Sequence, residues 1–322
     1  MLHEAIDMTS PTSSTPNRST SWLAGTIADL PTPFDDNDGV DWTAFAMLCE
    51  SQIEAGANAI VVAETSGEAS TLAPAEHDAI VRAAVKTARG RVRVIAGAGS
   101  NATSHAIERT RLAEAAGADA ILSVAPYYNK PMQAGITAHF RAIADSTGLP
   151  IILHDIPSRT VRGLADETIA RLAESPQFIG LRDGTGDVTR PRRLRSMLRP
   201  EFCLLCGDDA IALGYLLCGG DGCISTTASV VPELCRDLTA SCLQGRLRAA
   251  RSIAARLARL TAALGRNTPA APKYALSLLG LMSPRVRLPM VEACEEEKAE
   301  IAQAIAAFGD DAARPQPELS RS

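Results

Sequence analysis

The stretch PIILHDIPSRTVRGLADETIARLAESPQFIGLRDGTG, residues 150–186, contains one full copy of the pattern on which the fold assignment depends. An apolar run from Pro150 to Pro157 is followed by a helical pattern from Leu164 to Ala173 and by a second apolar run, Phe178 to Leu181. Short runs that are apolar on both faces are typical of parallel strands covered by helices. The stretch therefore predicts a strand–helix–strand unit.

The same alternation extends in both directions and reaches eight strand-like runs. The other six are Gly25 to Pro33, Ala59 to Ala63, Val92 to Gly97, Ala120 to Pro126, Phe202 to Cys206 and Gly222 to Ser225. Alanine-rich helical patterns lie between them. Eight such units favour a (β/α)₈ TIM barrel, with an open doubly wound sheet as the alternative. Apolar periodicity after residue 229 predicts extra C-terminal helices on the barrel.

Composition changes mark the boundaries of the folded part. Residues 1–21 are rich in Ser, Thr and Pro and predict a disordered arm, and residues 310–322 predict a disordered tail. Between them we expect the barrel over 22–228 and the packed helices over 229–309. No run approaches the ~20 apolar residues of a membrane span, so we expect no membrane partner.

Charge and cysteine content narrow the classes of partner. A net charge of -5 gives no basic surface for nucleic acid. The eight cysteines lie mostly in apolar runs without a disulfide framework, which favours a reducing cytoplasm. The pair Cys203 and Cys206 has metal-site spacing, but in a strand the two side chains point to opposite faces. We therefore expect no metal and no cofactor.

Gly97-Ala-Gly99-Ser-Asn-Ala102 formally matches a dinucleotide-binding fingerprint, because it follows a strand and opens a helix. It belongs to the third unit of the chain, however. Ser100, Asn101 and Thr103 serve equally well there as turn and N-cap residues. The motif alone is weak evidence for a dinucleotide.

In a barrel of this kind the active site lies at the carboxyl ends of the strands, and those ends are unusually polar here. The segments are ETSGE at 64–68, PYYNKP at 126–131, PSRT at 157–160, GLRDGTG at 180–186, GDD at 207–209 and GGDGCIS at 219–225. In type, order and spacing they resemble the dihydrodipicolinate synthase and N-acetylneuraminate lyase superfamily over roughly residues 23 to 300. The resemblance is strongest to dihydrodipicolinate synthase.

The resemblance implies roles for individual residues. Thr65 and Ser66 correspond to residues that hold the carboxylate of a 2-oxo acid, and Arg159 to a clamp for a second carboxylate at the pocket mouth. Tyr128 corresponds to a proton-relay tyrosine lent across a subunit interface, so a homo-oligomer, dimer or tetramer, is expected. Two further residues correspond to positions that line the pyruvate pocket: Gly207 and Ile224.

Three positions depart from the family pattern. The lysine that forms the Schiff base is replaced by Arg182, whose guanidinium stays protonated and cannot form an imine. A tyrosine is replaced by His154, and a glycine by Glu64. One interpretation is a new acid–base and oxyanion-binding site. The other is a compensating buried ion pair between Glu64 and Arg182, with His154 filling the space of the tyrosine.

Two functions follow as hypotheses. The first is a lyase or aldolase-like enzyme that acts on a pyruvate-like 2-oxo acid without the usual Schiff base. The second is a catalytically silent homologue that binds a 2-oxo acid or assembles with a competent paralogue. Feedback inhibition by lysine is not expected, because the position of the family's inhibitor-binding glutamate is His105.

Overall fold

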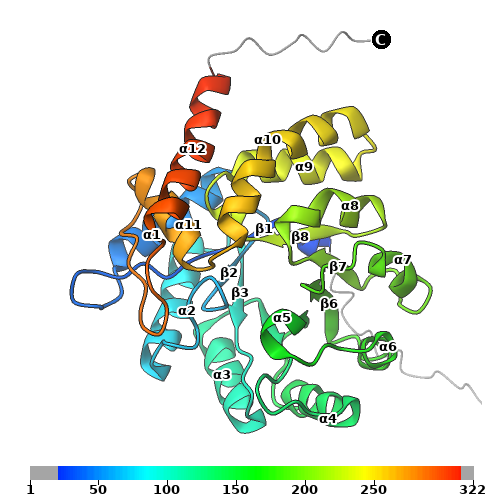
Figure 1. Cartoon of the computed structure of the whole chain (residues 1–322). Helices are drawn as coiled ribbons and strands as arrows, with labels where there is room; N and C mark the ends of the chain where they lie inside the picture. Colours follow the sequence, from blue (N-terminus) through cyan, green and yellow to red (C-terminus); the bar gives the residue numbers. More distant parts are fainter. Residues whose placement is uncertain (1–20, 313–322) are drawn as a thin grey trace, which may run out of the picture.

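The computed structural model describes residues 21–312, in which eight parallel strands close into a barrel (Figure 1). The strands pair in chain order, and β8 returns to β1. This closure confirms the TIM barrel and removes the open-sheet alternative. The strands are β1 Gly25–Asp29, β2 Ala59–Val62, β3 Arg93–Gly97, β4 Ala120–Val124, β5 Ile151–Asp155, β6 Phe178–Asp183, β7 Cys203–Cys206 and β8 Gly222–Ser225.

Helices surround the strands and continue beyond the eighth. The helices of the barrel are α1 Trp42–Glu54, α2 Pro74–Ala88, α3 Thr103–Ala116, α4 Gln133–Ala144, α5 Pro157–Thr160, α6 Asp166–Ala173, α7 Arg190–Arg195, α8 Ala212–Leu217 and α9 Pro232–Leu243. The appended helices are α10 Leu247–Gly265, α11 Ala270–Leu278 and α12 Glu295–Ala312. Short 3₁₀ helices cover Ser21–Leu23, Asp209–Ile211 and Thr227–Ser229.

Helix α9 completes the eighth unit, because it packs against β1 and β8. The boundary expected at residue 228 places this helix among the appended helices instead. Helix α12 reaches Ala312, whereas residue 309 was the expected end. Apart from Ser21 and this last turn, the arms expected at 1–21 and 310–322 lie outside the described residues. No helix in the described part of the chain is long and apolar enough to cross a membrane.

Both faces of the sheet are buried, as the continuous apolar runs predicted. One cluster fills the barrel interior and includes Ile27, Ile152 and Leu205. A larger cluster lies on the outer face and includes Leu153 and Leu204. Side chains alternate along a strand, so residues two positions after an interior residue also point inward. This alternation directs the last residues of several strands into the barrel mouth.

The two glycines of the formal dinucleotide motif serve packing within the barrel. A Cβ at Gly97 would lie 2.3 Å from the carbonyl oxygen of Ala63, and a Cβ at Gly99 would lie 2.5 Å from the backbone nitrogen of Val124. Neither position tolerates a side chain without movement of the neighbouring strand end. Close approach of strand ends therefore explains these glycines without a bound dinucleotide.

Candidate functional site

Two adjoining cavities lie at the carboxyl ends of the strands. The larger, about 280 Å³, is lined by residues that include Glu64, Arg109 and Tyr127. The smaller, about 230 Å³, is lined by residues that include Asp29 and Arg182 and is closed on one side by residues of α10. Thr65, Ile156 and Arg159 border both cavities. The polar segments that follow the strands therefore surround a single opening of the barrel, here called the mouth, as expected for a TIM barrel.

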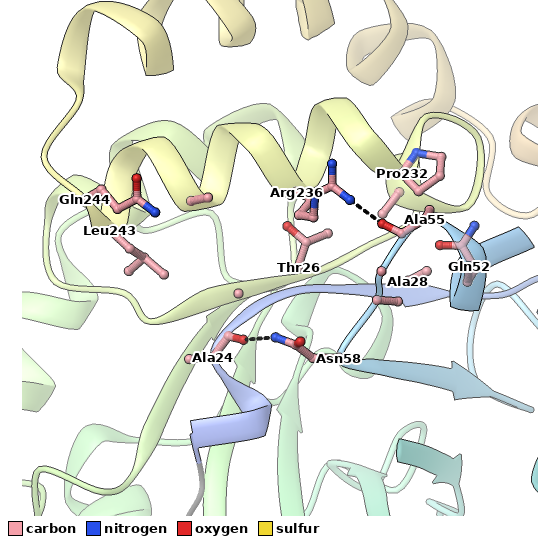
Figure 2. Close-up of a pocket in the computed structure, with 15 residues that line it drawn as sticks. Ala24, Thr26, Ala28, Gln52, Ala55, Asn58, Pro232, Arg236, Leu243 and Gln244 are labelled. Atoms are coloured by element: carbon pink, nitrogen blue, oxygen red, sulfur yellow. Dashed lines mark hydrogen bonds between the residues drawn. The ribbon is translucent and has the colours of Figure 1, made fainter. Parts of the chain in front are cut away.

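A separate hollow of about 290 Å³ lies beside the start of β1, between the end of α1 and helix α9 (Figure 2). Small residues form much of its wall. The Arg236 side chain donates to the carbonyl oxygen of Ala55, and Asn58 donates to that of Ala24 at 3.1 Å. None of the candidate site residues borders this hollow, so it is distinct from the mouth of the barrel.

The three substituted positions meet at the floor of the mouth. Arg182 Nη1 lies 3.1 Å from Glu64 Oε2, and His154 Nδ1 lies 2.9 Å from Glu64 Oε1. A fourth residue joins them, since Arg182 Nη1 also lies 2.9 Å from Asp29 Oδ2. All four side chains are buried, with at most 6% of any residue exposed. We call Asp29, Glu64, His154 and Arg182 the inner cluster.

The barrel topology brings these residues together. Asp29 and Glu64 come from β1 and the end of β2, whereas His154 and Arg182 are paired in register on β5 and β6. In an eight-stranded closed barrel these two pairs of strands face each other across the interior. The backbone at Ala63, with φ of 53°, bends the chain after β2. The ion pairs of the inner cluster therefore span the mouth.

The pKa shifts of the carboxyl groups in the inner cluster differ in direction. Burial opposes ionisation of Glu64, but the His154 imidazole, the Arg182 guanidinium and the Thr65 backbone N–H together hold the pKa of its carboxyl well below 4.5. Burial raises the pKa of Asp29 above 3.8 despite the Arg182 guanidinium, and Glu64 adds to the rise. The two carboxylates raise the pKa of Arg182 although burial opposes it. Glu64 is therefore the firmly ionised partner of Arg182.

Three polar atoms of the inner cluster have no hydrogen-bond partner among the described residues: Arg182 Nε, His154 Nε2 and Asp29 Oδ1. Buried polar atoms of folded proteins are nearly always bonded, so such exceptions point to function or strain. The Nδ1 atom of His154 lies 2.9 Å from Glu64 Oε1, whereas its Nε2 atom is open to a further partner. The arrangement thus combines a carboxylate-oriented imidazole with a permanently charged guanidinium.

The expected carboxylate holders are engaged within the chain. The Thr65 backbone N–H donates to the Glu64 carboxylate. Ser66 is buried, and its hydroxyl donates to Asp29 at 3.0 Å and lies 3.2 Å from the Thr226 hydroxyl. Both residues border the smaller cavity, and Thr65 also borders the larger. Their position agrees with the expected site, but these two polar groups already have partners.

The remaining candidate site residues lie at different places around the cavities. Arg159 is exposed at the mouth and donates from Nη2 to the Thr268 carbonyl at 3.1 Å. Gly207 lines the smaller cavity, whereas Ile224 packs in the barrel interior and borders neither cavity. Tyr128 is 87% exposed and borders neither cavity.

Two residues escaped the sequence reasoning. Asp29 was hidden in an apolar run, although its spacing from Ile27 places both side chains on the interior face. Lys273 on α11 was not among the candidate residues, yet it is fully buried and its Nζ lies 2.5 Å from Glu68 Oε1. Burial lowers the pKa of Lys273 to about 8. It borders neither cavity at the mouth.

In the described part of the chain, no group of three or more His, Cys, Asp or Glu side chains is arranged so that it could hold a metal ion. Cys203 packs in the interior cluster and Cys206 in the outer one. The two side chains therefore point to opposite faces of β7, as predicted from their spacing.

Comparisons with known proteins agree with the barrel fold. The family model described as "Dihydrodipicolinate synthetase family" matches residues 22–308. A 4-hydroxy-tetrahydrodipicolinate synthase of Hyphomonas neptunium is 48% identical over 287 residues, covering 88% of this chain and 98% of the relative. The crystal structure of dihydrodipicolinate synthase from Aquifex aeolicus has a TM-score of 0.87 at 35% identity and covers 89% and 98% of the two chains. A chloride-inhibited synthase of Acinetobacter baumannii, complexed with pyruvate, has a TM-score of 0.86 at 38% identity over 89% of this chain and 99% of that one.

Proposed function

Because the chain belongs to the dihydrodipicolinate synthetase family, we propose that it is an aldolase-like lyase that acts on a small 2-oxo acid without a Schiff base. One observation carries the proposal. Where the family resemblance places the nucleophilic lysine, Arg182 stands with its Nη1 held between two carboxylates. A guanidinium in this setting remains protonated and supplies charge instead of an amine.

The residues at the mouth support a division of tasks. Arg159 at the entrance offers a cation for a ligand carboxylate, and Arg182 at the floor offers its Nε–H group as a hydrogen-bond donor to the keto oxygen of the ligand. Glu64 borders the larger cavity and is bonded to His154 behind it. We assign proton transfer to this Glu64–His154 pair, with His154 as the base.

The test is a thermal-shift and calorimetric screen of 2-oxo acids and sugar acids, followed by assays of turnover with those that bind. Binding of a 2-oxo acid and turnover by the wild type are expected. His154→Phe should reduce turnover by ~10² to 10⁴, the usual contribution of a general base, with the fold intact. A wild type that binds no member of the panel, or a fully active variant, would contradict the proposal.

A second candidate, binding without turnover, is favoured by the bonds that three members of the inner cluster make to one another. Glu64, His154 and Arg182 are bonded to one another, and each is at most 6% exposed. Such a protein would act as a 2-oxo acid sensor or as an assembly partner of a competent paralogue. Binding by the wild type with no turnover of any ligand would select this candidate.

Assembly into a homo-oligomer, a dimer or tetramer, belongs to the same proposal. Tyr128 and Met132 are 87% and 73% exposed. Large apolar or aromatic side chains that are this exposed in one subunit are typical of a surface that a second subunit covers. We propose a reducing cytoplasm as its location, because no disulfide joins the cysteines of the described residues. Sedimentation as a monomer at micromolar concentration would refute the assembly.

A further inference from the structure

The Glu64 carboxylate is surrounded by three donors that converge on its two oxygens. Oε2 accepts from the Thr65 backbone N–H and from Arg182 Nη1, and Oε1 accepts from His154 Nδ1 at 2.9 Å. A backbone amide, a guanidinium and an imidazole arranged in this way form a complete binding position for a carboxylate. The carboxylate that occupies the position belongs to the chain itself.

The backbone bond is the most informative of the three. The Glu64 carboxylate accepts a hydrogen bond from the backbone N–H of the very next residue, so its side chain folds back over its own backbone. Arg182 and His154 arrive from the opposite wall of the barrel and hold the side chain in this position. Glu64 also borders the larger cavity. Space vacated by its side chain would therefore open into the mouth.

The remaining charge at the floor does not favour a second anion. Arg182 Nη1 is already shared between Glu64 and Asp29, at 3.1 and 2.9 Å. Another carboxylate placed here would meet two buried carboxylates that compete for the same guanidinium nitrogen. Like charges at such short range are strongly unfavourable in a poorly solvated site.

We propose that Glu64 is a tethered carboxylate that occupies the anion position at the floor of the mouth and excludes the carboxylate of any free ligand from it. A ligand of the wild type then directs its carboxylate outward, towards Arg159, and its keto or hydroxyl oxygen towards the floor. This orientation rests on the proposed binding of a 2-oxo acid. The tethered occupancy of the floor does not depend on it.

The experiment replaces Glu64 by alanine and adds a free carboxylate to the solution. Glu64→Ala should bind acetate and pyruvate at least ~10-fold more tightly than the wild type by calorimetry, since a free carboxylate can take the three vacated donors. Acetate should also raise the melting temperature of this variant and leave that of the wild type unchanged.

Two matched variants distinguish occupancy from charge. Glu64→Gln keeps a side chain of the same size in the position, and Asp29→Asn frees Arg182 Nη1 from its other carboxylate while Glu64 stays in place. Neither should gain affinity for acetate. No gain in Glu64→Ala, or an equal gain in either control, would overturn the proposal.

Folding of the variant is itself informative. Glu64→Ala leaves Arg182 paired with Asp29, one positive and one negative charge, so we expect a folded protein. A variant that folds only with acetate supports the tether, and one that stays unfolded with acetate, together with Glu64→Ser, counts against it. The proposed function is judged on the wild type with 2-oxo acids, and this inference on the variants with acetate, so either can fail alone.

Discussion

Two buried arginines hold carboxylates at the carboxyl ends of the strands, and they do so differently. Arg190, at the start of α7, has a partner for each guanidinium nitrogen: Nη1 lies 2.8 Å from Asp155 and 3.3 Å from Asp183, Nε bonds Asp166 and Nη2 bonds the Leu164 carbonyl. Asp155 and Asp183 directly follow His154 and Arg182, the register pair one position earlier on the same strands. Arg190 therefore fastens the strand ends that carry the inner cluster.

Arg182 is just as buried, but its cluster is less completely bonded. Its Nε has no partner among the described residues, and neither has Nε2 of His154. Three members of the inner cluster, Asp29, Glu64 and Arg182, border the cavities, whereas Arg190 borders none of the three described. Full bonding away from a cavity is expected of a structural fastening, and partial bonding beside one is expected of a site that meets a ligand. We therefore expect ligand contacts at His154 and Arg182, and a structural role for the aspartates that directly follow them and pair with Arg190.

The largest effect on stability should come from the fastening. Arg190→Met would leave Asp155 and Asp183 buried without their cation, so we expect the free energy of unfolding to fall by about 3 to 5 kcal/mol. Urea unfolding measures it. The neighbouring Arg193→Met, whose side chain is half exposed, should cost less than about 1 kcal/mol. Equal losses in the two variants would remove the distinction between fastening and surface pair.

A smaller loss is expected inside the barrel. His154→Phe removes one partner from Glu64, but Arg182 and the Thr65 N–H remain. The free energy of unfolding should therefore fall by about 1 to 3 kcal/mol, the usual effect of losing one buried hydrogen bond. A loss as large as that of Arg190→Met would show that the inner cluster is also a structural fastening.

The smallest effect concerns pH. The pKa of Asp29 is raised above 3.8, so the folded state binds this proton more tightly than the unfolded chain does. The stability that this proton contributes is lost as pH rises from 3.8 through the raised pKa. Asp29→Asn lacks this loss, so its unfolding free energy should improve relative to the wild type as pH rises above about 4. A constant or reversed difference in urea unfolding would refute the assignment.

The barrel and most of the mouth could be predicted because each polar motif follows a strand-like run. Periodicity identified the runs, and the rule that active sites lie at the carboxyl ends of barrel strands then placed Glu64, His154 and Arg182 together. Their contact could not be read from the sequence, because it depends on which strands face each other across the closed barrel. Distances across the interior follow from closure and register, which local patterns do not contain.

Asp29 and Glu64 show what else was missed. One charged residue at the end of an apolar strand reads as a turn, and only the alternation with Ile27 indicates that Asp29 points inward. The return of the Glu64 carboxylate to the Thr65 N–H depends on the backbone bend at Ala63, a non-glycine residue with positive φ. No sequence rule predicts that conformation for alanine. The resemblance to a family supplied the expected roles but not these new contacts.

The central claim, that the inner cluster has replaced imine chemistry, is tested most directly by borohydride reduction in the presence of pyruvate, with adducts located by mass spectrometry. The wild type should give no adduct. Arg182→Lys alone should give little, because a lysine between Asp29 and Glu64 would be held as the non-nucleophilic ammonium. Trapping at residue 182 should return when Glu64→Gly and His154→Tyr are added, and increase further with Asp29→Asn. An adduct on Lys130 or Lys273 of the wild type would contradict the account.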